Sequence, residues 1–312
     1  MNTKYNSVVV LLSTYNGEAF IQEQIDSLLR QRNVHVNVLI RDDGSTDSTL
    51  KILVKYTNLY SNIKLIKGCN EGYVRSFSDL VNQGLFLFKE EQFYAFCDQD
   101  DVWLPDKLYN SIVKLKEMDL NKPVLYCSNS YLIDGSGKKI GKFYDVMPNI
   151  NKANVLIYPT FQGCSMVFNR KAAEEYSLSI PQSGIHDEWM YYICNFLGNI
   201  FLDKEPQFLY RIHQGNQIGI NKHNTINDFI CRAKRLLYTK DTSRKFDLAN
   251  DFFKKYKVQI PQDSLEILQK YLRYKSSLKS KLELLKDKRF FPTTNNKVER
   301  FLEIIHILQN RA

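Results

Sequence analysis

Long hydrophobic runs are missing from this 312-residue chain. The longest apolar stretches contain about five residues, whereas a helix that spans a bilayer needs about 20. The apolar stretch at residues 8–12 is also too short for the core of a signal peptide, and polar residues follow it at once. We therefore expect a protein that has no membrane-spanning segment and resides in the cytoplasm.

Paired cysteines are missing as well. The cysteines stand singly, several of them inside apolar segments, and no C-x-x-C motif occurs. This pattern is typical of reduced thiols in the core of a cytoplasmic protein, and it argues against a disulfide framework or a zinc site. The six cysteines are Cys69, Cys97, Cys127, Cys164, Cys194 and Cys231.

Two common phosphate-binding motifs are absent. No G-x-G-x-x-G follows the first apolar segment, which argues against a dinucleotide-binding Rossmann domain, and no G-x-x-x-x-G-K-[ST] occurs, which excludes P-loop ATPases. A sugar nucleotidyltransferase would need a glycine-rich, basic loop here to hold a nucleoside triphosphate. Residues 13–18 contain one glycine and no lysine or arginine, so that activity is kept only as an alternative.

Charge is distributed unevenly along the chain. The net charge is +9, yet residues 221–312 hold 21 lysines and arginines against 10 acidic residues. This asymmetry predicts an acidic partner for the C-terminal part, such as an anionic membrane surface or a phosphorylated substrate. Nucleic acid is disfavoured because the aromatic residues there fall on helical stripes, not on a strand platform.

Strands and helices are predicted to alternate in the first part of the chain. Short apolar runs between polar residues are typical of buried strands, and apolar residues at helical spacing separate them. This alternation predicts right-handed βαβ units on a mainly parallel sheet, which is an α/β fold. The strands are expected at 8–12, 36–40, 63–66 and 93–97, and the helices at 18–31, 50–56 and 74–88.

The pattern becomes mixed after residue 105 and purely helical after residue 224. We therefore predict a catalytic domain at 1–220 and a basic helical region at 221–312. In the mixed part, helices are expected at 105–118 and 187–197, and short strands at 124–128, 131–133, 139–143, 164–168, 200–202 and 208–210. In the helical part, apolar stripes are expected at 226–237, 265–272 and 298–308.

A cluster of carboxylates follows the fourth predicted strand. Asp98, Asp100 and Asp101 lie within four positions, at the kind of strand end where open α/β sheets bind ligands. Three neighbouring carboxylates repel one another, and a divalent cation relieves that repulsion. Oxygen ligands suit Mg²⁺ or Mn²⁺. The alternative is a solvated acidic turn before a helix.

Other polar residues follow the first two predicted strands. Tyr15 offers a ring on which a nucleobase can stack, and Asp43 offers an acceptor for the imide N–H of a base. Both belong to the same edge of the predicted sheet as the acidic cluster. The alternative is that residues 43–45 form only a turn and a helix cap.

Three further positions have the chemistry of a transferase site. Asp187, beside His186 at a predicted helix start, offers a general base for a hydroxyl nucleophile, with helix capping as the alternative. His213 offers a metal ligand or a diphosphate contact, and a surface histidine is the alternative. Gly163 lies where an acceptor pocket or the start of a strand is expected.

Four motifs together resemble glycosyltransferase family 2, which has the GT-A fold, a Rossmann-like sheet flanked by helices. They occupy residues 13–18, 41–49, 96–103 and 186–189, and the resemblance extends over residues 7–219. It implies inverting transfer of a sugar from a nucleoside-diphosphate sugar, with Asp187 as the base and Mn²⁺ or Mg²⁺ as the cofactor.

The resemblance also implies roles for individual residues. Nucleotide contacts are expected from Thr14, Tyr15, Asn16, Glu18, Asp43, Asp98 and Gln99. Metal contacts are expected from Asp100, Asp101 and His213, and donor or acceptor sugar contacts from Gly163, His186, Trp189 and Trp103.

The Asp-Gln-Asp-Asp and His-Asp-x-Trp forms, with Tyr-Arg-x-His-x-x-Asn at residues 210–216, are most similar to bacterial rhamnosyltransferases of surface polysaccharide assembly. This implies dTDP-rhamnose or a UDP-hexose as donor and a saccharide or lipid-linked saccharide as acceptor. The Gln-x-x-Arg-Trp motif of processive members is absent, which favours transfer of one sugar. We expect the basic helices to contact the inner face of the plasma membrane, and we also expect a homodimer. A non-catalytic assembly scaffold is a further alternative.

Overall fold

The computed structural model describes residues 6–158, 161–179, 185–213, 244–291, and residues 304, 305, 307 and 308. These residues belong to two compact units. The first comprises 6–147, 161–179 and 185–213, and it holds every sequence motif named above apart from the end of the motif at 210–216. The second comprises 148–158 and the described residues after 243.

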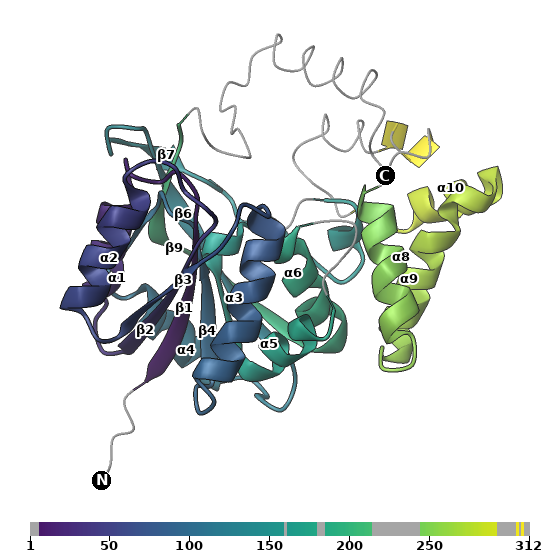
Figure 1. Cartoon of the computed structure of the whole chain (residues 1–312). Helices are drawn as coiled ribbons and strands as arrows, with labels where there is room; N and C mark the ends of the chain where they lie inside the picture. The colour runs from purple at the N-terminus through teal and green to yellow at the C-terminus, as the bar shows by residue number, and fades with distance from the viewer. Residues whose placement is uncertain are drawn as a thin grey trace. The chain divides into compact units, whose positions relative to one another are not determined.

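A parallel sheet forms the beginning of the first unit, as the alternating pattern predicts. β1 lies between β2 and β4, and β3 pairs with β2, all in parallel. In Figure 1, α1 and α2 lie on one side of these strands and α3 lies on the other. The elements are β1 Ser7–Thr14, α1 Ile21–Leu29, β2 His35–Asp42, α2 Thr49–Leu59, β3 Ile63–Lys67, α3 Tyr73–Leu87 and β4 Phe93–Cys97.

The sheet continues with strands of mixed direction. Within the described residues its order is β3-β2-β1-β4-β8-β6-β9-β5, and β7 pairs with β6. The predicted α/β class is therefore confirmed. The remaining elements of this unit are β5 Val102–Trp103, α4 Lys107–Lys116, β6 Val124–Ile133, β7 Lys139–Lys142, η2 Gly163–Ser165, β8 Met166–Asn169, α5 Arg170–Ser177, α6 His186–Leu197 and β9 Asn199–Arg211.

Two predicted pairs of short strands are each a single long strand, which corrects the sequence prediction. β6 runs through residues 128–130, whose polar side chains are buried. Its pairing with β9 shifts register beside Ser128 and Asn129, and the Asn129 side chain donates to the carbonyls of Tyr144 and Lys204. Buried polar residues thus interrupt the hydrophobic pattern of β6 without interrupting the strand.

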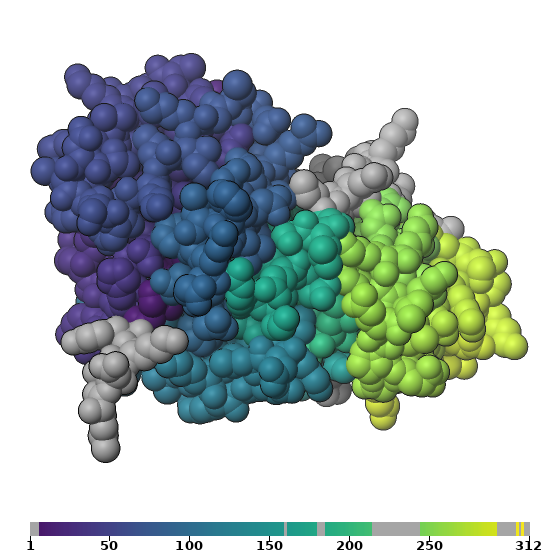
Figure 2. Space-filling view, turned by 60° about the horizontal axis from the view of Figure 1, so that its bottom comes forward, coloured from purple at the N-terminus to yellow at the C-terminus, as the bar shows by residue number. Residues whose placement is uncertain are grey.

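The second unit is helical in its described C-terminal part, and its surface is green to yellow in Figure 2. Leu248, Phe252, Leu268 and Tyr271 are fully buried. The stripe predicted at 226–237 lies outside the described residues. The elements are η1 Asn154–Leu156, α8 Arg244–Tyr256, α9 Gln262–Arg273, η3 Tyr274–Ser276 and α10 Leu278–Lys286.

A segment from the middle of the sequence belongs to this helical unit. The Lys245 ammonium donates to the carbonyl of Val155 at 3.2 Å and to that of Tyr158. The Lys152 ammonium donates to Ser264 Oγ at 2.9 Å. Residues 148–158 therefore share a unit with helices that begin about ninety residues later.

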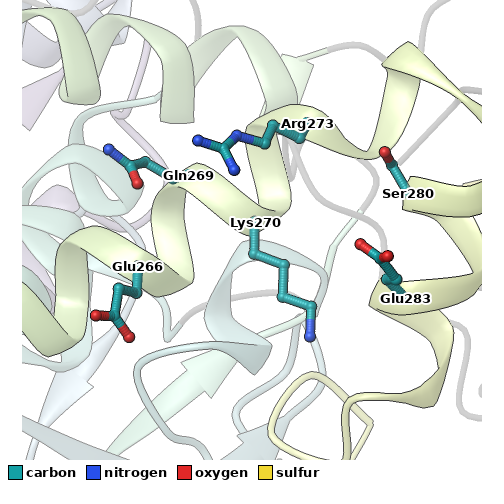
Figure 3. Close-up of a pocket in the computed structure, with 6 residues that line it drawn as sticks. All are labelled: Glu266, Gln269, Lys270, Arg273, Ser280 and Glu283. Carbon is teal, nitrogen blue, oxygen red and sulfur yellow. The ribbon is translucent and has the colours of Figure 1, made fainter.

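A pocket of about 270 Å³ lies between α9 and α10 and is drawn in Figure 3. No residue predicted to act in catalysis or binding lines it. Among the described residues, no helix is long and apolar enough to cross a membrane. The lining residues are Glu266, Gln269, Lys270, Arg273, Ser280 and Glu283.

Candidate active site

The carboxyl ends of β1, β2 and β4 lie side by side. Thr14 pairs in register with Asp42, and Leu12 pairs with Cys97. Gln99 ties the loop after β4 to the loop after β1, because its Oε1 accepts from Thr14 Oγ1 at 2.6 Å and from the Tyr15 amide at 2.9 Å. The structure thus brings together three segments that the sequence assigns to one site.

The loop after β1 is built against the loop after β2. Asn16 Oδ1 accepts from the Thr46 amide at 2.8 Å, and Glu18 Oε2 accepts from the Ser48 amide at 2.7 Å. These contacts give Asn16 and Glu18 a part in shaping the loop. The Tyr15 side chain stays 42% exposed, which leaves its ring accessible for stacking.

Gly17 lets this loop approach the acidic turn. A Cβ atom there would lie 2.4 Å from Gln99 Oε1 and 2.9 Å from Thr14 Oγ1. Any side chain would therefore displace Gln99 from the loop that it holds.

Asp43 is buried in an ion-pair network centred on Arg41. The Arg41 guanidinium is 3% exposed, pairs with Asp43, and contacts Glu71 and Asp79 at 3.1 Å each. Burial lowers the pKa of Arg41, but the carboxylates of Asp43 and Asp79 more than offset this and raise it above its usual value. Asp43 also accepts from the amides of Glu71 at 3.1 Å and Gly72 at 2.9 Å.

The acidic turn after β4 has an open side and a buried side. Asp100 Oδ2 lies 2.8 Å from His213 Nε2, and both side chains are partly exposed. Asp101 is buried, and its Oδ1 accepts from the Arg211 amide at 3.2 Å. Ligand atoms of Asp98, Asp101 and Cys164 lie within 4.8 Å of one another.

The turn is electrostatically suited to a cation. Burial raises the pKa of Asp98 to about 7, and the charge of Asp100 adds to this rise. Burial, with the charges of Asp100 and Asp98, raises the pKa of Asp101 well above its usual range. A bound divalent cation would relieve this repulsion, and the oxygen-rich donor set fits Mn²⁺ or Mg²⁺. Local sequence does not predict Cys164 beside these carboxylates, because this residue lies in a predicted strand.

Asp187 is held by backbone amides at the start of α6. Its Oδ1 accepts from the Glu188 amide at 2.7 Å, and its Oδ2 accepts from the Gly163 amide at 3.2 Å. Burial, followed by the charge of Glu188, raises the pKa of Asp187 to about 7. The carboxylate is therefore oriented and is a stronger base than an exposed aspartate.

His186 lies in an aromatic cage beside this carboxylate. Its ring stacks on Phe77 with centroids 3.9 Å apart and meets Phe96 edge-on at 5.0 Å. Burial lowers its pKa to about 3, so the imidazole is neutral. A Cβ on Gly163 would lie 2.6 Å from His186 Nε2, which explains the glycine there.

The two tryptophans of the motifs are core residues in this structure. Trp189 is 1% exposed and Trp103 is 2% exposed. The Trp103 ring faces the buried Lys107 ammonium at 3.7 Å from the ring centroid. Their predicted contact with a sugar stays a prediction, and the structure shows them packed inside the first unit.

A family model described as glycosyl transferase family 2 matches residues 9–177, more than half of the chain. The chain belongs to glycosyl transferase family 2. This confirms the family that the four motifs indicate. The match includes the loops after β1, β2 and β4 and ends before Asp187.

Two curated proteins are similar to this chain over most of their length. The dTDP-rhamnosyl transferase RfbG of Shigella flexneri is 27% identical over 225 residues, which is 67% of this chain and 74% of that protein. The UDP-Glc:alpha-D-GlcNAc-diphosphoundecaprenol beta-1,3-glucosyltransferase WfgD of Escherichia coli is 27% identical over 244 residues, which is 77% of this chain and 81% of that protein.

A solved structure shows the same fold. S. aureus TarS 1–349 in complex with UDP-GlcNAc superposes with a TM-score of 0.55 at 15% identity, covering 98% of this chain and 92% of that chain. The predicted GT-A fold, with helices after the sheet domain, is confirmed by this likeness.

Proposed function

We propose that this family 2 enzyme transfers one sugar from dTDP-rhamnose or a UDP-hexose to a hydroxyl of a saccharide acceptor in cell-surface polysaccharide synthesis. The observation that supports it most is the amide-held Asp187 carboxylate in the same unit as the acidic turn at 98–101. The names of RfbG and WfgD support these two donor classes.

In the proposed reaction, Asp187 takes the proton of the acceptor hydroxyl as its oxygen bonds to the anomeric carbon of the donor. The bond from that carbon to the diphosphate oxygen breaks on the opposite side, and the nucleoside diphosphate leaves with the electron pair. This single displacement inverts the anomeric centre. A base with a pKa near the working pH suits such a transfer.

Asp98, Asp100, Asp101 and His213 are the residues that would contact a cation and the diphosphate. A bound Mn²⁺ or Mg²⁺ supplies charge that neutralises the leaving diphosphate. Tyr15 would stack on the base, and Asp43 would accept its imide N–H while it holds the amides of residues 71 and 72.

Nucleotide binding tests the proposal directly. We expect UDP or dTDP with Mn²⁺ to raise the unfolding temperature by several degrees, because ligand at a hundred times its Kd stabilises by about 2.7 kcal/mol. Asp100→Ala should lose the increment that Mn²⁺ adds. Thermal shift assays with UDP, dTDP and GDP, with and without Mn²⁺, measure both.

The matched control is Asp119→Ala, which removes a carboxylate that accepts from the backbone amide of Asn121 at 3.1 Å and from the side-chain amide of Asn121 at 3.2 Å. It should respond to nucleotide and Mn²⁺ like the parent chain. The proposal is contradicted if no nucleoside diphosphate stabilises the parent chain under either condition.

We further propose that the helical unit contacts the inner face of an anionic membrane that carries a lipid-linked acceptor. Residues 244–291 hold thirteen lysines and arginines against six acidic residues. On α10, Leu278 is 66% exposed and Leu282 is 44% exposed. They are four residues apart and so share a helix face, and Lys279 and Lys281 lie next to them in sequence.

Vesicle sedimentation tests this contact. Replacing both Leu278 and Leu282 by serine should weaken partitioning to phosphatidylglycerol-containing vesicles at least about tenfold, since burying a leucine contributes about 1.5–3 kcal/mol. Leu178→Ser, at a leucine 67% exposed in the first unit, should change nothing. Equal partitioning of all three proteins would refute the contact. Light scattering of the same proteins without vesicles measures the predicted homodimer separately from membrane contact.

A further inference from the structure

The end of β9 holds the acidic turn through main-chain and side-chain contacts. Arg211 Nε donates to the Asp100 carbonyl at 2.9 Å, and the Arg211 amide donates to Asp101 Oδ1 at 3.2 Å. Two residues later, His213 Nε2 lies 2.8 Å from Asp100 Oδ2. One strand end therefore holds both the backbone and the carboxylate of Asp100.

The same guanidinium also reaches the first helix. Arg211 Nη2 pairs with Glu23 Oε2 of α1 at 2.5 Å, and the guanidinium carbon lies 4.8 Å from the centroid of the Phe20 ring. Arg211 Nη1 donates to the Gly135 carbonyl at 3.3 Å. α1 begins directly after the loop that holds Tyr15 and Glu18, so Arg211 connects the acidic turn to the segment after that loop.

These contacts depend on the shape of the arginine side chain. A guanidinium presents its donors in a fixed planar array, whereas an ammonium is a single point of charge on a flexible stem. Arg211 is 2% exposed, so the guanidinium itself is held within the fold. A lysine there cannot reach the Asp100 carbonyl, Glu23 and the Gly135 carbonyl together.

We propose that Arg211 is a positioning residue that fixes the Asp100 carboxylate for a divalent cation and couples it to the nucleotide loop through Glu23 and Phe20. The proposal rests on the function proposed above. It adds a residue of the 210–216 motif that has no role in the proposed chemistry itself.

Direct Mn²⁺ binding tests the proposal. Electron paramagnetic resonance of free Mn²⁺ gives the Kd with and without UDP or dTDP, in the complete chain. We expect Arg211→Lys to weaken Mn²⁺ binding by about 10- to 100-fold, as loss of a group that orients a metal ligand does. Glu23→Gln, at a side chain 54% exposed, should weaken it by about two- to fivefold.

Arg170→Lys is the matched control. Arg170 is partly buried, pairs with Glu174 at 3.0 Å and donates to the carbonyls of Phe88 and Glu91 in the same unit. Its replacement should lower the unfolding temperature without changing the Kd for Mn²⁺. A purely structural role for Arg211 would give the same result in Arg211→Lys.

The outcomes separate the two proposals. If the parent chain binds Mn²⁺ and folded Arg211→Lys binds it equally tightly, the positioning role is wrong and the cation site stands. If the parent chain does not bind Mn²⁺ at all, the cation site and the positioning role are both wrong. If Arg211→Lys does not fold, parent-like affinity in Glu23→Gln refutes the coupling to α1.

Discussion

Replacement of Asp187 by asparagine is expected to lower kcat for sugar transfer by about 10²- to 10⁴-fold, the usual contribution of a general base. Asparagine has nearly the same shape, but its amide cannot take the proton of the acceptor hydroxyl. Steady-state transfer from a panel of nucleotide sugars measures the effect, and calorimetry of nucleotide binding should give a Kd close to that of the parent chain.

The pH dependence of the parent enzyme provides a second measure of the same residue. Because burial raises the pKa of Asp187 to about 7, the carboxylate is protonated below that pH and ionised above it. We therefore expect kcat to rise with pH through about 7 and then level off. Asp119→Asn should keep the parent profile. Turnover by Asp187→Asn within tenfold of the parent would remove Asp187 as the base.

Replacement of Arg41 by methionine is expected to destabilise the fold by about 3–5 kcal/mol, the usual cost of leaving a buried charge without its partner. Asp43 would keep the amides of Glu71 and Gly72 but lose the guanidinium. For a unit of about 200 residues this corresponds to a fall of roughly 6–20 °C in the unfolding temperature. Calorimetry measures the change.

Arg32 offers a matched arginine–aspartate pair at the surface. It pairs with Asp106, and the two side chains are 62% and 40% exposed. Arg32→Met should cost only about 0–1 kcal/mol. Equal effects of the two substitutions would show that burial does not decide the contribution of Arg41.

The strand ends that build the site can be predicted from local sequence. The strands β1, β2 and β4 contain short, mostly apolar runs, and Ser13, Arg41 and Asp98 are the first polar residues after those runs. In a parallel sheet such ends share one edge, so the meeting of three loops follows from pattern alone. The predicted extents of β6 and β9 are wrong for the opposite reason, because polar residues in mid-strand, buried in β6 and mostly exposed in β9, resemble a loop in sequence.

The contacts that set the site's geometry lie beyond local pattern. Gln99 is hydrogen-bonded to Thr14, 85 positions away in sequence, and Arg211 is hydrogen-bonded to Asp100, 111 positions away. Neither pair has a periodicity or composition that links it. The proximity of Cys164 to Asp98 and Asp101 also depends on the antiparallel pairing of β8 with β4. Such pairings are products of tertiary packing.

The membership of residues 148–158 in the helical unit has a consequence for synthesis of the protein. A ribosome adds about 5–20 residues per second, so this segment is synthesised on the order of 4–20 seconds before Lys245 of α8. During that interval the carbonyls of Val155 and Tyr158 lack the ammonium that they later contact. Val155 and Leu156 are both buried in the complete fold, but α8 has not yet been synthesised during that interval. The nascent chain therefore passes through a stage in which its middle depends on a part not yet translated.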